Sequence, residues 1–499
     1  MLPDEEANRR LVANVHPPDW VNPEPASRYN LVVIGAGTAG LVTAAGAAGL
    51  GAKVALVERH LMGGDCLNVG CVPSKTLLRS ARAASDAVSS ARFGVETGEV
   101  AVDFRVVMAR LRTIRAGLSH HDSAERFRQL GVDVFIGEGR FAGRDLVDVA
   151  SRRLRFKRAV IATGSRARSL PVEGLEAAGY LTNETVFSLT ERPGRLALIG
   201  GGPLGCELAQ AFQRLGTRVT LFEAGAHVLA REDPDAAAIV ERALLDDGVR
   251  LERSVEITSV ACGPEGKRIA FRRDDGRIDT VSVDEILVGV GRRPDVGGLG
   301  LDLAGVEHGL HGVTVNDALQ TSNPSIYAAG DVCLEQKFTH AADAAARIVV
   351  QNALFAGRRK VSALTIPRCT YTDPEIAHVG LSRGDAEARG VPVRTFVTPL
   401  TSVDRAVTDG DEEGFVKIHV RRGSDRILGA TIVARHAGDL ISEITVAMAG
   451  RVGLGALANV VHPYPTQADA IRRTGDAYNR TRLTPAIRAI LERWLRWTR

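Results

Sequence analysis

The sequence lacks the segments that take a chain into or across a membrane. Its first twenty residues carry acids, arginines and prolines, and they contain no apolar core of the kind found in secretory signals. No uninterrupted apolar run is long enough to span a bilayer. We therefore expect a cytoplasmic protein in a reducing environment.

The chain also has few cysteines and a small net charge. The chain has six cysteines in 499 residues, and in a reducing compartment a close pair of them is more often catalytic or metal-binding than structural. A net charge of only +4 gives no case for a nucleic-acid partner. No stretch has the bias of a fibre or a low-complexity linker. The length favours about three globular domains, at roughly 150 residues each.

A glycine-rich turn between two apolar strands marks the first recognisable unit, at residues 30–58. The predicted strand 31–34 runs into Gly35-x-Gly37-x-x-Gly40, followed by an alanine-rich helix and a second strand, 54–57, that ends at Glu58. Such glycines permit a tight turn, close approach of a pyrophosphate and close helix packing, while the helix N-terminus attracts the phosphates. Glu58 stands where a carboxylate accepts a hydrogen bond from a ribose hydroxyl.

The same pattern occurs again at residues 195–223. A predicted strand is followed by Gly200-x-Gly202-x-x-Gly205, a helix, and a strand that ends at Glu223. An internal duplication that kept the fold but lost its ligand would give the same sequence pattern. Two intact units favour two nucleotides bound to one chain, in an α/β fold with two Rossmann-like three-layer domains.

Residues beyond about 363 change in character. The stretches "IPRCTYTDPEIAHVG", "GFVKIHV" and "ILGATIV" are typical of β-strands, and later stretches of helices. This predicts a separate C-terminal α+β domain.

Cys66 and Cys71 follow the first unit within "GGDCLNVGCVPSK". On a regular helix, five positions would turn their side chains roughly 140° apart, so a bridge between them requires an irregular first turn. Pro73 is compatible with a helix that starts near Cys71, and a thiolate at a helix N-terminus is stabilised. We therefore predict that Cys71 is the electron-accepting sulfur beside a cofactor and that Cys66, on the looser side, attacks an outside substrate. The other four cysteines are scattered, which argues against zinc and predicts no metal site.

The combination of motifs resembles the class I pyridine nucleotide–disulfide oxidoreductases, which include lipoamide dehydrogenase, glutathione reductase and mercuric reductase. "GGDCLNVGCVPSK", both glycine units, "ATG", "GRRPD", "IYAAGDV" and "TDPEIAHVG" occur in the order of that family. The resemblance covers residues 30 to about 480. It implies a homodimeric enzyme in which hydride passes from a nicotinamide to FAD, and electrons pass from FAD to the Cys66–Cys71 disulfide.

The resemblance also assigns residues to each cofactor. It implies that FAD is contacted by Gly35, Gly37, Gly40, Glu58, Lys75, Thr163, Gly164 and Asp331. It implies that the nicotinamide cofactor is contacted by Gly200, Gly202, Gly205, Glu223 and Gly291. Lys75 and Glu207 match positions near the flavin and the nicotinamide, and are predicted to act in catalysis.

One departure from the family pattern concerns the acid–base residue. Most members carry a catalytic His-Pro-Thr followed by an acid three residues later. Here "VVHPYPTQADA" aligns on Pro465, Thr466 and Asp469, and Tyr464 takes the histidine position, as in mercuric reductase. Tyrosine, with an ordinary pKa near 10, is a poor base at neutral pH. His462 either substitutes as the base or is a structural histidine.

A second departure weakens the match to mercuric reductase. Members with that activity generally end in a cysteine pair that hands over Hg(II), but the last cysteine here is Cys369 and the N-terminal residues hold no CxxC module. The chain is therefore expected to be mercuric reductase-like without the usual metal hand-off.

The predicted domain boundaries follow from these motifs. We expect an N-terminal arm or poorly ordered leader, an FAD-binding domain in two segments, a nucleotide-binding domain, a dimerisation domain and a basic amphipathic C-terminal helix. Their residues are 1–29, then 30–185 with 311–362, then 186–310, 363–480 and 481–499. The C-terminal helix is expected to pack on its own dimer, with a membrane surface as the alternative.

The terminal electron acceptor stays open at this stage. A disulfide or a thiol-bound metal ion is the main expectation; a lipoamide dehydrogenase or glutathione reductase activity, a membrane-peripheral quinone-like reductase and a non-enzymatic flavin-binding assembly component are alternatives. NADH is expected as the donor rather than NADPH. Glu223 would repel a 2′-phosphate, and Ala224 and Ala230 stand where arginines that bind the phosphate would be expected, although Arg231 is one position away.

Overall fold

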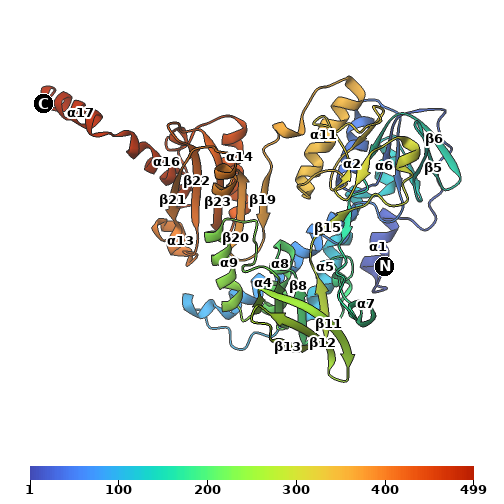
Figure 1. Cartoon of the computed structure of the whole chain (residues 1–499), viewed down its shortest axis with the longest axis horizontal. Helices are drawn as coiled ribbons and strands as arrows, with labels where there is room; N and C mark the ends of the chain where they lie inside the picture. The colour runs from blue at the N-terminus through green and yellow to red at the C-terminus, as the bar shows by residue number, and fades with distance from the viewer. The chain divides into compact units, whose positions relative to one another are not determined.

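The computed structural model describes residues 1–499 and divides the chain into two compact units (Figure 1). Unit 1 comprises residues 1–226 and 248–364, and unit 2 comprises residues 227–247 and 365–499. The predicted fold class, mixed α/β with two nucleotide-binding sheets and a C-terminal α+β part, is confirmed.

The first sheet of unit 1 has seven strands in the order β3-β2-β1-β6-β5-β4, with β18 also paired to β6. Strands β1, β2 and β6 run parallel, and the residues of β1 and β2 are almost all buried, as expected for a sheet covered on both faces. The helix after β1, α2, packs against β1, β2 and α11. The strands are β1 (Tyr29–Ile34), β2 (Val54–Glu58), β3 (Val132–Ile136), β4 (Arg140–Gly143), β5 (Leu146–Val149), β6 (Arg152–Ile161) and β18 (Ile326–Ala328).

The second sheet of unit 1 is parallel, in the order β10-β9-β8-β14, and an antiparallel sheet β11-β12-β13 accompanies it. The parallel strands are β8 (Arg195–Ile199), β9 (Arg218–Glu223), β10 (Arg250–Arg253) and β14 (Glu285–Val288). The others are β11 (Val255–Gly263), β12 (Gly266–Arg273) and β13 (Ile278–Val283), with a short pair β7 (Ser165–Ala167) and β15 (Arg292–Pro294) and the bridge β16 (His308–Gly309) and β17 (Gly312–Val313).

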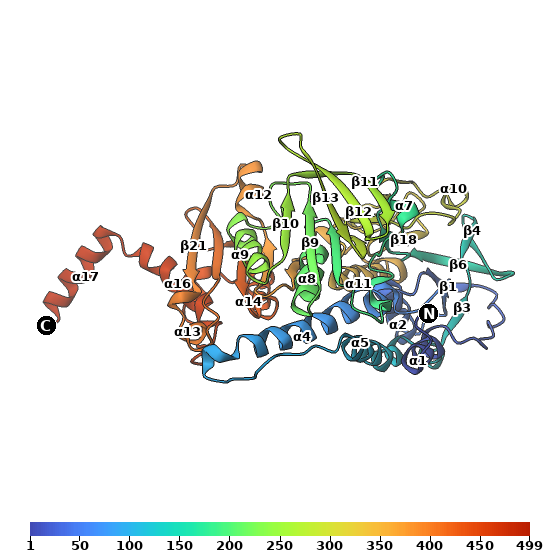
Figure 2. The same ribbon diagram turned by 90° about the horizontal axis from the view of Figure 1, so that it is seen from below.

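Ten α-helices belong to unit 1. The long α4 lies beside α5 and α8, and α5 in turn contacts α1 (Figure 2). They are α1 (Glu6–Val15), α2 (Thr38–Gly49), α3 (Gly64–Asn68), α4 (Cys71–Val88), α5 (Phe104–Leu118), α6 (Ala124–Gln129), α7 (Leu175–Ala178), α8 (Pro203–Arg214), α10 (Leu301–Ala304) and α11 (Thr339–Phe355).

The N-terminal segment is docked onto unit 1, so the expectation of a poorly ordered leader is wrong. Leu11 and Val15 of α1 are fully buried. Arg115 of α5, itself buried, donates to the side chain of Asn8 at 2.7 Å and to the backbone oxygen of Asn68 at 2.7 Å. The arm is ordered because it covers apolar surface and supplies an acceptor to a buried guanidinium, neither of which is visible in its polar composition.

Unit 2 is built on an antiparallel sheet in the order β19-β20-β23-β22-β21. Helix α9 follows β9 in the sequence but packs against β20 and β23, where Lys417 of β22 contacts Asp233 and Asp235 at 2.8 and 2.6 Å. The strands are β19 (Pro367–Thr370), β20 (Glu375–Gly380), β21 (Val393–Pro399), β22 (Phe415–Arg421) and β23 (Ile427–Ala434). The helices are α9 (Pro234–Asp246), α12 (Arg383–Ala388), α13 (Asp404–Asp409), α14 (Ala437–Ala449), α15 (Leu454–Leu457), α16 (Asp469–Arg482) and α17 (Pro485–Trp497).

Candidate active site

The first glycine turn joins β1 to α2 as predicted. Gly35 has φ +102°, a left-handed conformation that favours glycine, and a Cβ on Gly40 would overlap the carbonyl oxygen of Gly35. Gly37 caps α2 without any side-chain hydrogen bond. The first amides of α2 therefore have no side-chain acceptor and are oriented to receive an anion.

Glu58, at the end of β2, is directed at this turn. Its carboxylate accepts hydrogen bonds from the backbone N–H of Ala36 at 2.7 Å and of His60 at 2.8 Å. Burial raises the pKa of this carboxyl, while the two backbone hydrogen bonds oppose that shift. The amides thus hold the carboxylate beside the loop, where it can also accept from a ribose hydroxyl.

The second glycine turn repeats this geometry between β8 and α8. Gly202 caps α8 without a side-chain hydrogen bond, and no atom lies within 4 Å of the position that a Cβ on it would take. Glu223 accepts from the N–H groups of Gly201 at 2.6 Å and Gly225 at 2.7 Å. A Cβ on Gly205 would overlap the oxygen of Gly200, which explains the third glycine.

Both turns fit a dinucleotide. Each turn has a helix N-terminus without a side-chain cap and a carboxylate held by backbone amides. A Cβ on Gly202 would meet no atom within 4 Å, and a Cβ on Gly37 would meet only the Cα of Gly64, at 3.7 Å. Helices α5 and α9 differ from these, because the side chains of Asp103 and Asp233 accept hydrogen bonds from their first backbone amides. The first turn would hold FAD and the second NAD(P)H, and together they would supply hydride transfer.

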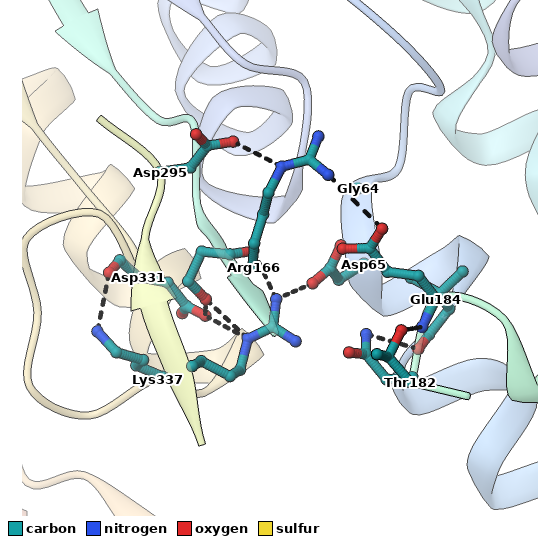
Figure 3. Close-up of polar contacts among 12 residues, drawn as sticks. Gly64, Asp65, Arg166, Thr182, Glu184, Asp295, Asp331 and Lys337 are labelled. Atoms are coloured by element: carbon teal, nitrogen blue, oxygen red, sulfur yellow. Dashed lines mark hydrogen bonds and ion pairs between the residues drawn. The ribbon is translucent and has the colours of Figure 1, made fainter. Parts of the chain in front are cut away.

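A polar network joins the segments that follow strands β6, β14 and β18 (Figure 3). Ser165 donates to Asp331 at 2.7 Å, Arg292 donates to Ser165 at 2.7 Å and also contacts Asp65, and Thr163 donates to the backbone oxygen of Asp295 at 2.7 Å. Gly164, in the left-handed region at φ +71°, accepts from the Asp295 N–H.

This network brings two predicted flavin contacts, Thr163 and Asp331, toward the loop that carries the cysteines. Asp65, adjacent to Cys66, is tied to Arg292, and Lys337 donates to the backbone oxygen of Asp331 at 2.9 Å. Gly291 directly precedes Arg292 and adopts φ +107°. The contacts of Arg292 with Ser165 and Asp65 join segments 127 and 227 residues apart in the sequence, which is why the motifs alone did not reveal them.

Cys66 and Cys71 are both free thiols, and each is the other's hydrogen-bonding partner. Cys66 lies in the short helix α3, which ends at Asn68, and Cys71 is the first residue of α4. Val69 and Gly70 break the helical path between them. This is the irregular connection that the spacing requires. Cys71 is the more exposed of the two in this chain, and Cys66 is of intermediate exposure.

The electrostatics nevertheless assign the thiolate to Cys71. The hydrogen bond from Cys66 is the main cause that lowers the pKa of Cys71 to about 6; it outweighs burial, and Thr339 and Lys75 act in the same direction. The same hydrogen bond raises the pKa of Cys66, and burial adds to that effect. At neutral pH the reduced pair therefore holds one thiolate, at Cys71, and one thiol, at Cys66.

Thr339 was missed by the sequence reasoning. Its hydroxyl lies 3.3 Å from the Cys71 sulfur, although 268 residues separate them. The stretch "KFTHAADAAAR" contains a hydroxyl residue at the start of α11, and that is the one signal that could have pointed to it.

Lys75 and Glu207 form an ion pair. The Lys75 ammonium lies 2.8 Å from the Glu207 carboxylate, whose side chain is only 5% exposed. Lys75 is one turn after Cys71 on α4, and Glu207 lies on α8, so the pair connects the cysteine helix to the helix of the second glycine turn. The two sequence-predicted residues are thus brought together.

Tyr464, His462 and Asp469 belong to unit 2. The Tyr464 hydroxyl donates to Asp404 at 2.8 Å, and this hydrogen bond and the charge of Asp404 raise the pKa of the phenol. Burial raises the pKa of Asp469, but hydrogen bonds from Arg472 and Arg473 lower it below the ordinary value. Tyr464 and Asp469 therefore do not pair with each other.

His462 has a carboxylate partner. Its Nε2 lies 3.0 Å from Glu443 and its Nδ1 lies 3.0 Å from the backbone oxygen of Val460, and its side chain is 7% exposed. The imidazole is therefore fixed in orientation by contacts on both sides.

The site combines two dinucleotide-binding turns with an adjacent dithiol, and the Lys75–Glu207 ion pair links the helices α4 and α8. This combination defines a flavoprotein disulfide oxidoreductase. The chain belongs to the pyridine nucleotide-disulphide oxidoreductase family, whose sequence profile matches residues 29–347, and the dimerisation domain of that family matches residues 366–474. Enzymes of this family use FAD and take electrons from NAD(P)H.

The similar proteins include enzymes of two different activities. A mercuric reductase of Lysinibacillus sphaericus is 34% identical over 445 residues, which cover 89% of this chain and 81% of the relative. A dihydrolipoyl dehydrogenase of Bacillus subtilis is 31% identical over 466 residues, which cover 89% of this chain and 97% of the relative. These identities are too similar to choose the substrate.

Solved structures agree with the fold. LpdA from Mycobacterium tuberculosis superposes with a TM-score of 0.82 at 28% identity and covers 91% of this chain and 100% of its own. A Cu(II) complex of the HOCl-induced flavoprotein disulfide reductase RclA from Escherichia coli gives 0.80 at 25% identity, covering 89% and 98%. Among the helices of the structure, none combines the length and the apolar character needed to cross a membrane.

Proposed function

We propose that this enzyme passes electrons from a nicotinamide through FAD to the Cys66–Cys71 disulfide, and from the dithiol to a metal ion held by thiolates, in the manner of a mercuric reductase. Reduction by NAD(P)H delivers two electrons and opens the disulfide. The dithiol returns to the disulfide when it passes these two electrons to one Hg(II) ion or to two Cu(II) ions. The single observation that carries the choice of acceptor is Tyr464.

The argument from Tyr464 concerns protons. A disulfide substrate becomes two thiols and so takes up two protons, which calls for a proton-exchanging residue near the sulfur. A metal ion bound by thiolates accepts electrons without a proton. Tyr464 stands at the family's histidine position. Its hydroxyl donates a hydrogen bond to Asp404, and the pKa of the phenol is raised. It suits the second kind of acceptor.

Within the dithiol, Cys71 is the sulfur that faces the flavin and Cys66 is the sulfur that engages the acceptor. The helix N-terminus and the Cys66, Thr339 and Lys75 side chains stabilise a Cys71 thiolate. Cys66 retains its proton in the reduced pair and can lose it when a metal ion binds. The Lys75–Glu207 pair connects the two cofactor-binding halves and would position them for transfer.

The working form is proposed to be a homodimer. The match to the family's dimerisation domain supports this assembly, and the family resemblance implies that the acid–base position serves the dithiol of the other subunit. Tyr464 of one subunit would then act beside Cys66 of its partner. NADH is the proposed donor, because Glu223 ends β9 where it would accept from a 2′-hydroxyl and repel a 2′-phosphate.

An acceptor panel tests this proposal. The purified flavin-loaded enzyme is assayed with NADH and, in turn, a thiol-complexed Hg(II), a thiol-complexed Cu(II), lipoamide and glutathione disulfide. We expect turnover with a metal ion, little with the disulfides, and loss of the metal turnover in Cys66→Ser. Efficient turnover of a disulfide together with none of either metal would contradict the proposed acceptor.

A disulfide reductase of the dihydrolipoyl dehydrogenase type is the second candidate. One observation favours it: His462 lies 3.0 Å from Glu443, and a histidine oriented by a carboxylate can exchange protons. If His462 is the base, His462→Ala abolishes lipoamide turnover and Tyr464→Phe leaves it unchanged. If His462 is structural, both variants retain whatever low lipoamide turnover the unaltered enzyme has.

A further inference from the structure

The helix α17 has no buried residue. Every residue from Pro485 to Trp497 is exposed, although five of them are large apolar side chains on one side of the helix. Their exposed fractions are 43% for Ile487, 67% for Ile490, 46% for Leu491, 57% for Trp494 and 77% for Trp497. An apolar surface of this kind favours a partner.

The apolar side chains share one face. At about 100° per residue, these five positions fall within an arc of roughly 120°, with Leu495 at its edge. The arginines Arg488, Arg493 and Arg496 lie on the remaining arc. The helix is therefore amphipathic, with an apolar face on one side and a basic face on the other.

The charge of the segment points to an anionic partner. Residues 477–499 contain six arginines, and Glu492 is the only acid among them. Glu492 is shared between Arg488 at 3.1 Å and Arg496 at 4.0 Å, which leaves a strong excess of positive charge on the polar face. Anionic lipid headgroups complement that face while the acyl region receives the apolar one.

The two tryptophans favour a lipid surface over a protein groove. The rings of Trp494 and Trp497 lie with centroids 5.3 Å apart at the end of the apolar face. Indoles prefer the boundary between headgroups and hydrocarbon. A helix of thirteen residues is about 20 Å long, too short to cross a hydrocarbon core of roughly 30 Å, so it would lie in the plane of the surface.

A second copy of this chain is the competing occupant. The match to the family's dimerisation domain ends at residue 474, eleven residues before α17 begins, so the matched domain does not include this face. Two such helices packed through their apolar faces would also bring their basic flanks together.

We propose that α17 binds the surface of a membrane rich in anionic lipids, with Ile487, Ile490, Leu491, Trp494 and Trp497 inserted and the arginines on the headgroups. The enzyme is then a peripheral membrane protein anchored at its C-terminal end. This inference stands apart from the choice of electron acceptor.

Flotation with lipid vesicles tests the proposal. The full-length flavin-loaded enzyme is mixed with vesicles of phosphatidylcholine and phosphatidylglycerol in equal parts, or of phosphatidylcholine alone. We expect binding to the anionic vesicles only, weakened by salt because the attraction is screened. The double variant Trp494→Ala/Trp497→Ala should lower the affinity by at least roughly tenfold, and Arg493→Gln/Arg496→Gln should reduce the salt dependence.

The controls separate the lipid surface from the other partners. Leu310→Ala removes an apolar side chain that is even more exposed, at 95%, and lies far from α17 in the sequence; this variant should bind vesicles as the unaltered enzyme does. All variants should oxidise NADH at the unaltered rate, because every residue of α17 is exposed and none belongs to the candidate active site. An unaltered enzyme that fails to float with anionic vesicles overturns the proposal. So does a tryptophan variant that floats normally, or one that changes only the oligomeric state in sedimentation, which would assign the face to a second copy.

Discussion

The hydrogen bond between Cys66 and Cys71 predicts how the thiolate of the reduced enzyme depends on pH. The Cys66 thiol is the main cause that lowers the pKa of Cys71 to about 6, compared with an ordinary value near 9. At pH 7 a group with this pKa is about nine-tenths ionised. The reduced enzyme should therefore hold a Cys71 thiolate at neutral pH, and lose it as the pH falls through about 6.

Replacing Cys66 with alanine removes the donor. A hydrogen bond to a charged group contributes about 1.5–3 kcal/mol, and one pH unit corresponds to about 1.4 kcal/mol. Because a thiol is a weak donor, the lower end applies, and we expect the midpoint to rise by about one pH unit. Cys66→Ser keeps a donor in the same place, so its midpoint should remain near 6. The comparison separates the hydrogen bond from the helix N-terminus, which both variants retain.

The assay is the long-wavelength absorbance of a thiolate beside oxidised flavin, titrated with pH. Neither Cys66 variant can form the disulfide, so Cys71 is free and no reductant is needed. Cys71→Ser should show no such absorbance at any pH. Identical midpoints for Cys66→Ala and Cys66→Ser would refute the hydrogen-bond explanation, and an absorbance that persists in Cys71→Ser would refute the assignment of the two sulfurs.

Three further outcomes are expected. Tyr464→His should raise kcat/KM for lipoamide at neutral pH, because an imidazole can exchange a proton that this phenol cannot; efficient lipoamide turnover before the change would contradict that reasoning. The ratio of kcat/KM for NADH over NADPH should be roughly 30 to 100, from a missing phosphate contact and repulsion by Glu223; a preference for NADPH would show that Arg231 or another side chain binds the phosphate. Asn8→Ala should lower the free energy of unfolding by about 2 kcal/mol in urea denaturation, since it removes the side-chain oxygen that accepts from one nitrogen of the buried Arg115 guanidinium and leaves the acceptor at Asn68 in place; an unchanged midpoint would mean that the arm does not stabilise unit 1.

Local patterns determined the parts of this protein that depend on neighbours in the sequence. The first predicted strand, 31–34, lies within β1 at 29–34, and the second, 54–57, within β2 at 54–58. Gly35 and its counterpart Gly200 stand in tight turns because the backbone reverses over a few residues, and such a requirement is recorded in the residue itself. The interruption between Cys66 and Cys71 was predictable for the same reason, since helical geometry forbids their meeting without it.

Tertiary structure decided which side chains complete the site. The Thr339 hydroxyl that contacts the Cys71 sulfur comes from 268 residues away, and the Glu207 partner of Lys75 comes from 132 residues away. Spacing along the chain carries no information about such pairs. The family resemblance placed Lys75 and Glu207 near the cofactors, but only the packing of α4 against α8 joined them as an ion pair.

The ends of the chain illustrate the same division. A polar, proline-containing composition suggested a loose N-terminal leader, yet Leu11 and Val15 of α1 are fully buried. For α17 the periodicity alone predicted the amphipathic helix, because a face repeats with the turn of the helix. That its apolar face stays exposed in the chain is a property of the whole fold, since burial depends on which surfaces the other elements leave uncovered.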